Sequence, residues 1–165
     1  EARYQLLTES SPTAAIARLN RSLSAAMADN HFVTLVLVVL DPKSGQLTVV
    51  NAGHPPPLIC PPGGQAAEID AQGSGFPLGV EKDAVYKECA LEVPRGGLVA
   101  VYTDGIREAV NAEREIYGLD RLCKGLQATS GDPRHIGQHI VDDVLQFIAN
   151  NPQADDMCLV CFRRE

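Results

Sequence analysis

The sequence has 165 residues, of which 45% are hydrophobic and 21% are charged. This composition is ordinary for a soluble globular protein, and the length suits one domain better than two. The 14 Lys and Arg residues are outnumbered by 21 Asp and Glu, which gives a formal net charge of −7. That balance argues against binding to nucleic acid or to an anionic membrane surface, because both require an excess of basic side chains. The longest apolar run, 32–40, is far shorter than the roughly 20 residues that span a bilayer, so no membrane insertion is expected in this segment.

The five cysteines are an odd number and are scattered along the chain. This pattern argues against a disulfide framework and favours a reducing cytoplasm. Cys158 and Cys161 form a C-x-x-C motif inside a predicted strand, where positions three apart face opposite sides. No second Cys pair or nearby His completes a zinc site. We therefore interpret both as buried strand cysteines.

The first predicted elements are a helix and a β-hairpin. Ser11 is a good N-cap, and the helical spacing of apolar residues after it predicts a helix over 12–30. The run 32–40 is rich in β-branched residues and apolar on both faces, which predicts a strand buried on both sides. Turn residues join it to a second strand at 47–51, so the pair is predicted to form a hairpin.

The second half combines short strands with helices. Val85, Cys89, Leu91 and Val93 alternate with polar residues, a pattern that predicts a half-exposed strand. Further strands are predicted at 58–60, 67–69, 98–102 and 157–162, and helices at 106–111, 119–128 and 133–149. Because helices and strands do not alternate regularly, we expect an α/β (α+β) fold with a largely antiparallel sheet system.

Two acidic segments are candidates for a metal site. Asp104 follows the buried strand 98–102 and is itself followed by Gly105, which permits a tight turn and close backbone approach. Asp155 and Asp156 precede the last predicted strand. If that strand is antiparallel to 98–102, the two segments converge, and converging carboxylates favour a hard cation such as Mg²⁺ or Mn²⁺. The alternatives remain a helix cap at Asp104 and a solvated acidic turn at Asp155.

Two histidines are weaker candidates. His135 and His139 have the i, i+4 spacing of a metal pair on a helix, but the residues between them supply no acid for a metalloprotease motif. We interpret both as structural.

A series of motifs in a fixed order resembles the PPM-type phosphatases of the protein phosphatase 2C superfamily. Its branch is that of stage II sporulation protein E and the sigma-factor-regulation phosphatases. The motifs are Phe32-Val33-Thr34-Leu35, Leu40-Asp41, Gly45-Gln46-Leu47, Asn51-Ala52-Gly53-His54-Pro55-Pro56, Phe76-Pro77-Leu78-Gly79, Tyr102-Thr103-Asp104-Gly105, Glu108-Ala109, Tyr117-Gly118 and Asp155-Asp156-Met157. Each motif is weak alone, and the ordered set is specific.

The resemblance implies a fold, an activity and a site. The fold would be a central antiparallel β-sandwich flanked by helices, with residues 1–165 forming a single phosphatase-like domain. The activity would be hydrolysis of phosphoserine or phosphothreonine by water at a two-metal Mn²⁺ or Mg²⁺ centre. Asp104 and Asp155 match the family's metal ligands, Asp156 and Gly105 would support them, and His54 would be structural. The substrate would be a phosphorylated signalling protein of the anti-sigma-factor antagonist type in a bacterial cytoplasm.

The sequence departs from the family at its start. The family's N-terminal strands carry a Gly-Asp motif and an Asp-x-x-Gly-His-Gly motif, and neither is found ahead of the helix predicted at 12–30. We therefore expect a C-terminal portion of the domain that lacks its first core strands, binds metal weakly and is a poor enzyme. An exposed sheet edge would then favour self-association, such as a homodimer. The alternative is a degenerate, non-catalytic phosphatase-like module that binds a regulatory protein partner.

Overall fold

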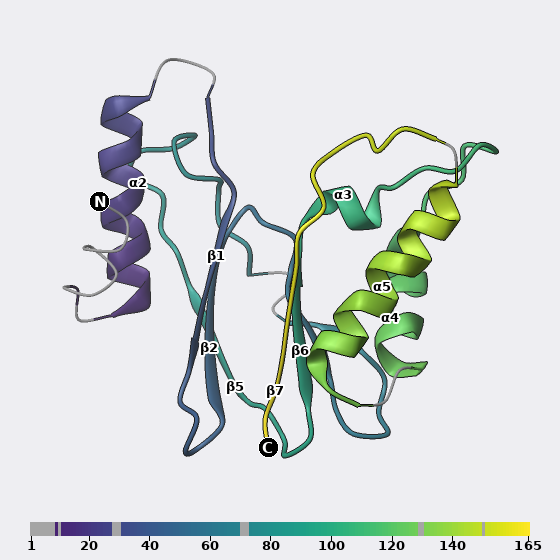
Figure 1. The fold of residues 1–165 in the computed structure, drawn as a ribbon. Coiled ribbons are helices and arrows are strands. Elements are labelled where there is room, and N and C mark those ends of the chain that lie inside the picture. Colours follow the sequence, from purple (N-terminus) through teal and green to yellow (C-terminus); the bar gives the residue numbers. More distant parts are fainter. Residues whose placement is uncertain (1–8, 10, 28–30, 70–72, 129–130, 150) are drawn as a thin grey trace. The chain divides into compact units, whose positions relative to one another are not determined.

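The computed structural model describes residues 9, 11–27, 31–69, 73–128, 131–149 and 151–165. The chain divides into two compact units, Glu1–Pro56 with Ile69–Glu92 and Pro57–Glu68 with Val93–Glu165. Each unit has its own sheet and its own helices (Figure 1). Among the helices of the described residues, none is both long and apolar enough to span a membrane.

The first unit contains a three-stranded antiparallel sheet and one long helix. The sheet has the order β1-β2-β5, formed by β1 (Leu35–Leu40), β2 (Gln46–Ala52) and β5 (Glu88–Glu92). Helix α2 (Pro12–Ala26) follows its N-cap Ser11, whose hydroxyl accepts a 3.2 Å hydrogen bond from the Ala14 amide. The predicted helix and the β1–β2 hairpin are thus confirmed within the described residues, and residues 28–30 of the helix prediction lie outside them.

The core of this unit lies between α2 and the sheet. Its buried members are Ile16, Leu19, Val50, Ala52, Leu78, Ala84 and Tyr86. Asn20 is fully buried beside them, a polar group that costs free energy unless it is hydrogen-bonded. Its amide donates to the carbonyls of Glu81 and Lys82 at 2.7 and 3.0 Å and accepts from the Gly79 amide at 2.9 Å. This side chain therefore ties α2 to the segment that follows Leu78.

Two predictions for this unit were wrong. The 32–40 run is not buried on both sides, because β1 is the outer strand of the three-stranded sheet and Val39 is 44% exposed. The central strand is β2, in which Leu47, Val49 and Val50 are completely buried. The second prediction was wrong only in part: the half-exposed strand is confirmed at β5, whose residues alternate between exposed and partly buried, but Val85 precedes β5 and is exposed while its neighbour Tyr86 is buried.

The second unit contains a four-stranded antiparallel sheet of order β4-β3-β6-β7. Its strands are β3 (Leu58–Cys60), β4 (Ala67–Glu68), β6 (Leu98–Tyr102) and β7 (Leu159–Arg163). Its helices are α3 (Asp104–Arg107), α4 (Gly118–Ala128) and α5 (Pro133–Ile148). Helix α3 begins earlier and is shorter than the predicted helix at 106–111, and the other elements lie within two residues of their predicted bounds.

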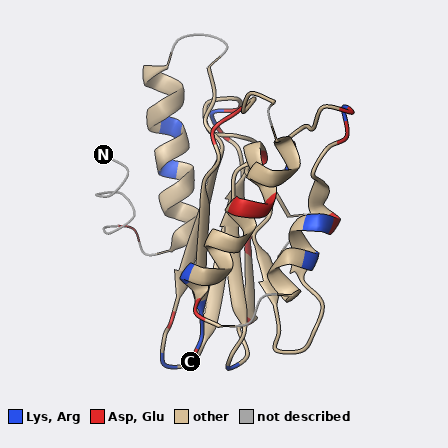
Figure 2. Ribbon diagram, turned by 45° about the vertical axis from the view of Figure 1, so that its right-hand side comes forward, with Lys and Arg blue, Asp and Glu red and all other residues tan. Residues whose placement is uncertain are grey.

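Helices α4 and α5 lie side by side and pack against the sheet that contains β6 and β7 (Figure 1). The apolar face of α5 supplies Ile136, Ile140, Val144 and Ile148 to the core. The strands are mostly uncharged, and charged residues lie mainly on helix surfaces and at turns (Figure 2). Both sheets are antiparallel, and helices pack beside them. The predicted α+β fold with antiparallel sheets is confirmed.

Hydrogen bonds among Tyr117, Arg121 and Asp143, here called the clasp, link α4 and the residue before it to α5. Arg121 donates two hydrogen bonds to the Asp143 carboxylate at 2.7 and 2.9 Å, and the Tyr117 hydroxyl donates a third at 2.7 Å. The Arg121 guanidinium also lies over the rings of Tyr117 and Phe147, at 5.1 and 4.8 Å from their centroids. The Arg121 hydrogen bonds hold the pKa of Asp143 below its usual range.

Candidate active site

Thr103 joins the end of β6 to the segment that precedes β7. Residue Tyr102 pairs with Leu159 at the last position of the β6–β7 ladder, and the Thr103 amide extends the ladder by donating to the Cys158 carbonyl at 3.0 Å. The Thr103 hydroxyl donates to the Asp156 carbonyl at 2.9 Å and accepts from the Cys158 amide at 2.9 Å. Three hydrogen bonds from one residue therefore hold the two acidic segments against each other.

Gly105 makes the closest approach between these segments. A Cβ atom on Gly105 would lie 3.1 Å from the Asp155 carbonyl oxygen and would overlap with the Asp156 carbonyl oxygen. Glycine is therefore required here by the approach of the chain's own backbone. The sequence led us to expect that this glycine lets the backbone approach a bound ligand; the close neighbour in the structure is the Asp155–Asp156 backbone.

The two candidate ligands, Asp104 and Asp155, both have exposed side chains. The Asp104 Oδ1 atom accepts from the Gly105 amide at 3.1 Å, and the Asp155 Oδ1 atom accepts from the Asp156 amide at 2.7 Å. Each carboxylate is thus oriented by the next amide in the chain. Because Thr103 and Gly105 bring their backbones together, the structure bears out the predicted convergence of the two acidic segments.

The donor set fits a hard divalent cation only in part. Carboxylate oxygens are the protein ligands that Mg²⁺ and Mn²⁺ prefer, and Mg²⁺ is commonly held by one or two carboxylates with water completing the shell. Among the described residues, however, no cluster of three or more His, Cys, Asp and Glu side chains could hold a metal ion. Within the described residues, Asp104 and Asp155 therefore supply carboxylate ligands of the right kind but too few for a complete two-metal centre.

The sequence did not indicate a role for Gln153, and Thr103 was noted only as a member of the Tyr102-Thr103-Asp104-Gly105 motif. The Gln153 side-chain amide donates to the Asp155 carbonyl at 2.7 Å, which adds a hydrogen bond within the segment itself. A threonine between a buried strand and an Asp-Gly pair is a signal that could have been used, because Thr hydroxyls commonly bond to nearby backbone groups. Asp156, predicted as a supporting residue, contributes its backbone, since its carbonyl accepts from Thr103 and its amide donates to Asp155.

The histidine candidates do not join this site. His135 and His139 are exposed on α5, and His135 lies 3.9 Å from Asp132. His54 belongs to the first unit, where its amide donates to the Asn51 side chain and its carbonyl accepts from it, both at 2.8 Å. This closed turn agrees with a structural interpretation of the Asn51–His54 motif.

The cysteine prediction is partly wrong. Cys161 is partly buried, but Cys158 is exposed because β7 begins only at Leu159. Both are free thiols. Burial raises the pKa of Cys161 to about 11.

Comparisons with known proteins match almost the whole chain. Residues 2–165 match the family described as stage II sporulation protein E (SpoIIE). The SiaA-PP2C domain of Pseudomonas aeruginosa superposes with a TM-score of 0.84 at 18% identity, over 99% of this chain and 65% of that one. A structure of the PP2C phosphatase domain and part of the regulatory domain of SpoIIE from Bacillus subtilis gives 0.83 at 21% identity, over 98% and 47%.

Two curated relatives are similar in sequence. Protein IcfG of Synechocystis is 27% identical over 133 residues, which is 81% of this chain and 21% of that protein. The phosphoserine phosphatase RsbU of Bacillus subtilis is 23% identical over 156 residues, 93% of this chain and 45% of that protein. The chain thus spans less than half the length of these relatives. Because the family match covers residues 2–165, the chain belongs to the stage II sporulation protein E family of PP2C-type phosphatase domains.

Proposed function

We propose that the chain forms the C-terminal portion of a metal-dependent phosphatase domain that hydrolyses phosphoserine or phosphothreonine. The observation that carries the proposal is the junction between the two acidic segments. Thr103 and Gly105 hold the backbones of Asp104 and Asp155–Asp156 in contact at the end of the β6–β7 ladder. Two carboxylates are costly to bring together without a neutralising charge, so the junction supports a cation site.

In the reaction, the protein would hold the metal ion and orient the carboxylates that bind it. The Asp104 and Asp155 carboxylates would bind Mn²⁺ or Mg²⁺, and the amides of Gly105 and Asp156 would fix the orientation of those carboxylates. A cation bound there would lower the pKa of coordinated water and neutralise charge on the phosphoryl oxygens. The exposure of both side chains supports access by a phosphoprotein substrate.

The names of two relatives support a substrate class for this chain. RsbU and RsbP of Bacillus subtilis are phosphoserine phosphatases by name. We propose a phosphorylated bacterial signalling protein of the anti-sigma-factor antagonist type as the substrate, and the cytoplasm as its location. The manganese soak of a similar SpoIIE phosphatase domain supports trying Mn²⁺ first.

The test is Mn²⁺-dependent phosphate release from a phosphoserine peptide by the 165-residue chain. Asp104→Asn and Asp155→Asn would be assayed beside Asp120→Asn, a matched control on the exposed surface of α4. We expect slow, Mn²⁺-dependent turnover that falls at least tenfold in the first two variants and is unchanged in the third.

Two results would count against the proposal. Turnover that persists in Asp104→Asn would place the chemistry elsewhere. Absence of turnover at every Mn²⁺ concentration, with intact binding of a phosphoprotein, would favour the non-catalytic binding module.

A further inference from the structure

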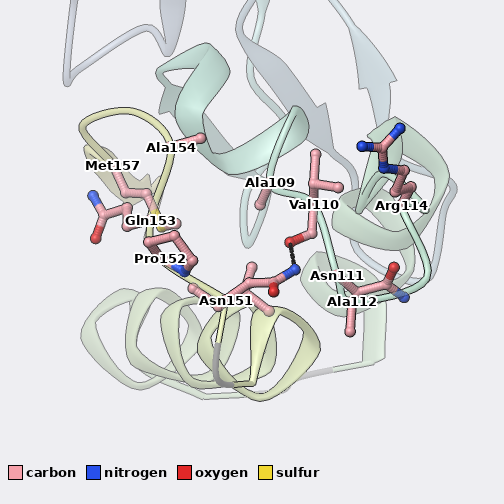
Figure 3. A pocket seen from close by; sticks show the side chains of 11 residues that line it. Ala109, Val110, Asn111, Ala112, Arg114, Asn151, Pro152, Gln153, Ala154 and Met157 are labelled. Carbon is pink, nitrogen blue, oxygen red and sulfur yellow. Dashed lines mark hydrogen bonds between the residues drawn. The ribbon is translucent and has the colours of Figure 1, made fainter.

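A pocket of about 340 Å³ lies in the second unit, beside the candidate active site (Figure 3). One wall is the segment 109–114, which follows α3, and the other is the segment 151–157, which follows α5. The two walls are joined by a 3.2 Å hydrogen bond from the Asn151 side-chain amide to the Val110 carbonyl. A volume of this size is at the lower end of the range of small-ligand sites and can accept one or two amino-acid side chains.

The interior of this pocket is mainly apolar. Ala109, Ile148 and Met157 contribute aliphatic or thioether surface, and Ala109 and Ile148 are themselves nearly buried. The Asn151 amide is engaged by the Val110 carbonyl, and the Gln153 amide is engaged by the Asp155 carbonyl. Since these two polar groups are already hydrogen-bonded, the pocket favours an aliphatic ligand group.

The pocket walls are continuous with the segments that carry the candidate metal ligands. Ala154 lines the pocket and directly precedes Asp155, while Met157 lines it two residues later. The opposite wall begins at Ala109, five residues after Asp104. Both walls of the pocket therefore carry residues that are close in the sequence to a candidate metal ligand.

A positively charged side chain, that of Arg114, lies at the far side of the pocket. Figure 3 shows Arg114 across the pocket from Ala154 and Met157. Among the residues that the structure describes, the Arg114 guanidinium has no hydrogen bond or ion pair, and its side chain is exposed. Its backbone has a positive φ of 64°, a conformation that costs a non-glycine residue free energy.

The Arg114 turn is held in place locally. The Arg114 amide donates to the Asn111 carbonyl at 3.1 Å, and the Asn111 side chain exchanges two hydrogen bonds with Glu115 at 2.8 and 2.9 Å. These bonds fix the backbone of the turn, and its exposed Arg114 side chain carries a positive charge on a chain whose formal net charge is −7. Such a charge is complementary to an acidic group on a ligand.

We propose that the pocket recognises the substrate segment next to the phosphorylated residue. The proposal rests on three neighbouring features: the acidic segments, the apolar pocket and the Arg114 side chain. The phosphoresidue would lie at Asp104 and Asp155, an aliphatic side chain would enter the pocket, and an acidic group beyond it would pair with Arg114. This inference rests on the proposed phosphatase function and adds the sequence preference of its phosphoprotein substrate.

The experiment is an NMR titration of the ¹⁵N-labelled chain, in excess Mg²⁺, with nine-residue phosphoserine peptides. In the peptide set, one leucine on an otherwise Gly-Ser background moves through every position flanking the phosphoserine, and a second set adds one aspartate. Two pocket variants are used, Ala112→Leu, which fills the pocket, and Arg114→Gln, which removes the charge. Their matched controls are Ala128→Leu and Arg134→Gln, exposed positions on α4 and α5.

We expect one leucine position to bind about tenfold more tightly than the Gly-Ser peptide, because a filled apolar pocket gives discrimination of that order. Amides of 109–114 and 153–157 would shift, Ala112→Leu would abolish the leucine preference, and Arg114→Gln would abolish the aspartate preference. Equal binding of all peptides, or equal behaviour of the pocket variants and their controls, would overturn the inference.

A parallel turnover assay with the same peptides and Mn²⁺ keeps the two proposals separable. Turnover that ignores the flanking residue and is unaffected by Ala112→Leu would overturn the pocket's role while the phosphatase function stands. A selective pocket in a chain without Mn²⁺-dependent turnover would support the recognition of phosphopeptides and contradict the catalytic proposal.

Discussion

Gly105 and Asp156 are in such close backbone contact that no side chain can stand between them. A Cβ atom at Gly105 would lie 3.0 Å from the Asp156 carbonyl carbon and would overlap with its oxygen. The contact joins two segments that are fifty residues apart in the sequence. It explains how a short helix at the end of β6 and an irregular loop before β7 come together, each carrying one candidate metal ligand.

Gly105→Ala should therefore displace the Asp155–Asp156 segment. We expect a loss of about 2 to 4 kcal/mol in the free energy of unfolding, because the clash is with backbone that cannot rotate away. Urea unfolding measures the change. The matched control is Gly137→Ala on α5, where the nearest atom to a new Cβ is 4.0 Å away, so the helix should gain up to about 1 kcal/mol. Equal effects of the two substitutions would contradict this explanation.

Thr103→Val tests the hydroxyl that links the two segments. Valine keeps the β-branched shape but loses the bonds to the Asp156 carbonyl and the Cys158 amide. We expect the free energy of unfolding to fall by about 1 to 2 kcal/mol. The Cys158 amide should also exchange with solvent faster in hydrogen-exchange NMR. Thr48→Val on β2 is the control, and similar losses in both variants would show that the hydroxyl at position 103 has no special role.

The clasp between α4 and α5 predicts a pH-dependent contribution to stability. The pKa of Asp143 is lowered, first by the hydrogen bonds from Arg121 and then by that from Tyr117. A lowered pKa in the folded state adds stability above the unfolded pKa of about 4, and this stability is lost as the pH falls through the lower, folded value. Asp143→Asn should cost about 1 kcal/mol at pH 7, a modest value because Arg121 is 41% exposed and solvent screens the pair.

The measurement for the clasp is urea unfolding of Asp143→Asn at pH 7 and at pH 2.5. The difference from the parent chain should be present at pH 7 and shrink at pH 2.5. The control is Asp142→Asn, since Asp142 is exposed and accepts only from Gln138 of its own helix among the hydrogen bonds described. A penalty for Asp143→Asn that grows on acidification would contradict the assignment.

The cysteines should differ widely in reactivity. Burial raises the pKa of Cys161 to about 11 and raises the pKa values of Cys60 and Cys123, so little thiolate forms at these positions at pH 8. Cys158 is exposed. Brief iodoacetamide treatment of the folded chain should therefore modify Cys158 first, as read by peptide mass spectrometry, with uniform labelling in urea as the control. Labelling of Cys161 at the rate of Cys158 would contradict the prediction.

The sequence predicted elements better than it predicted burial. Capping residues such as Ser11, apolar periodicity and turn clusters are local signals, and they located nearly all helices and strands. The prediction that the apolar run 32–40 is buried on both sides was wrong, because the burial of a strand depends on its neighbours and β1 is an outer strand in this structure. Position within a sheet is a long-range property that composition cannot reveal.

The candidate site was predictable in outline and not in detail. An antiparallel pairing of β6 and β7 was enough to infer that the segments carrying Asp104 and Asp155 meet. The Thr103 and Gln153 hydrogen bonds were not foreseen, because they depend on the path of an irregular loop. The pocket beside Arg114 was also missed, since its walls are about forty residues apart in the sequence and the motifs that touch them, Glu108-Ala109 and Asp155-Asp156-Met157, do not indicate a cavity.

We propose that Asp104 and Asp155 bind one divalent cation together. The direct test is a Mn²⁺ titration, in which paramagnetic broadening is followed in the ¹H–¹⁵N NMR spectrum. The method detects weak binding and does not depend on turnover. We expect the amides of 104–105 and 155–156 to broaden together at low Mn²⁺. Asp104→Asn or Asp155→Asn should abolish the effect at both segments, while Asp120→Asn should leave it intact. Broadening of only one segment, or broadening that survives Asp104→Asn, would contradict a shared metal site.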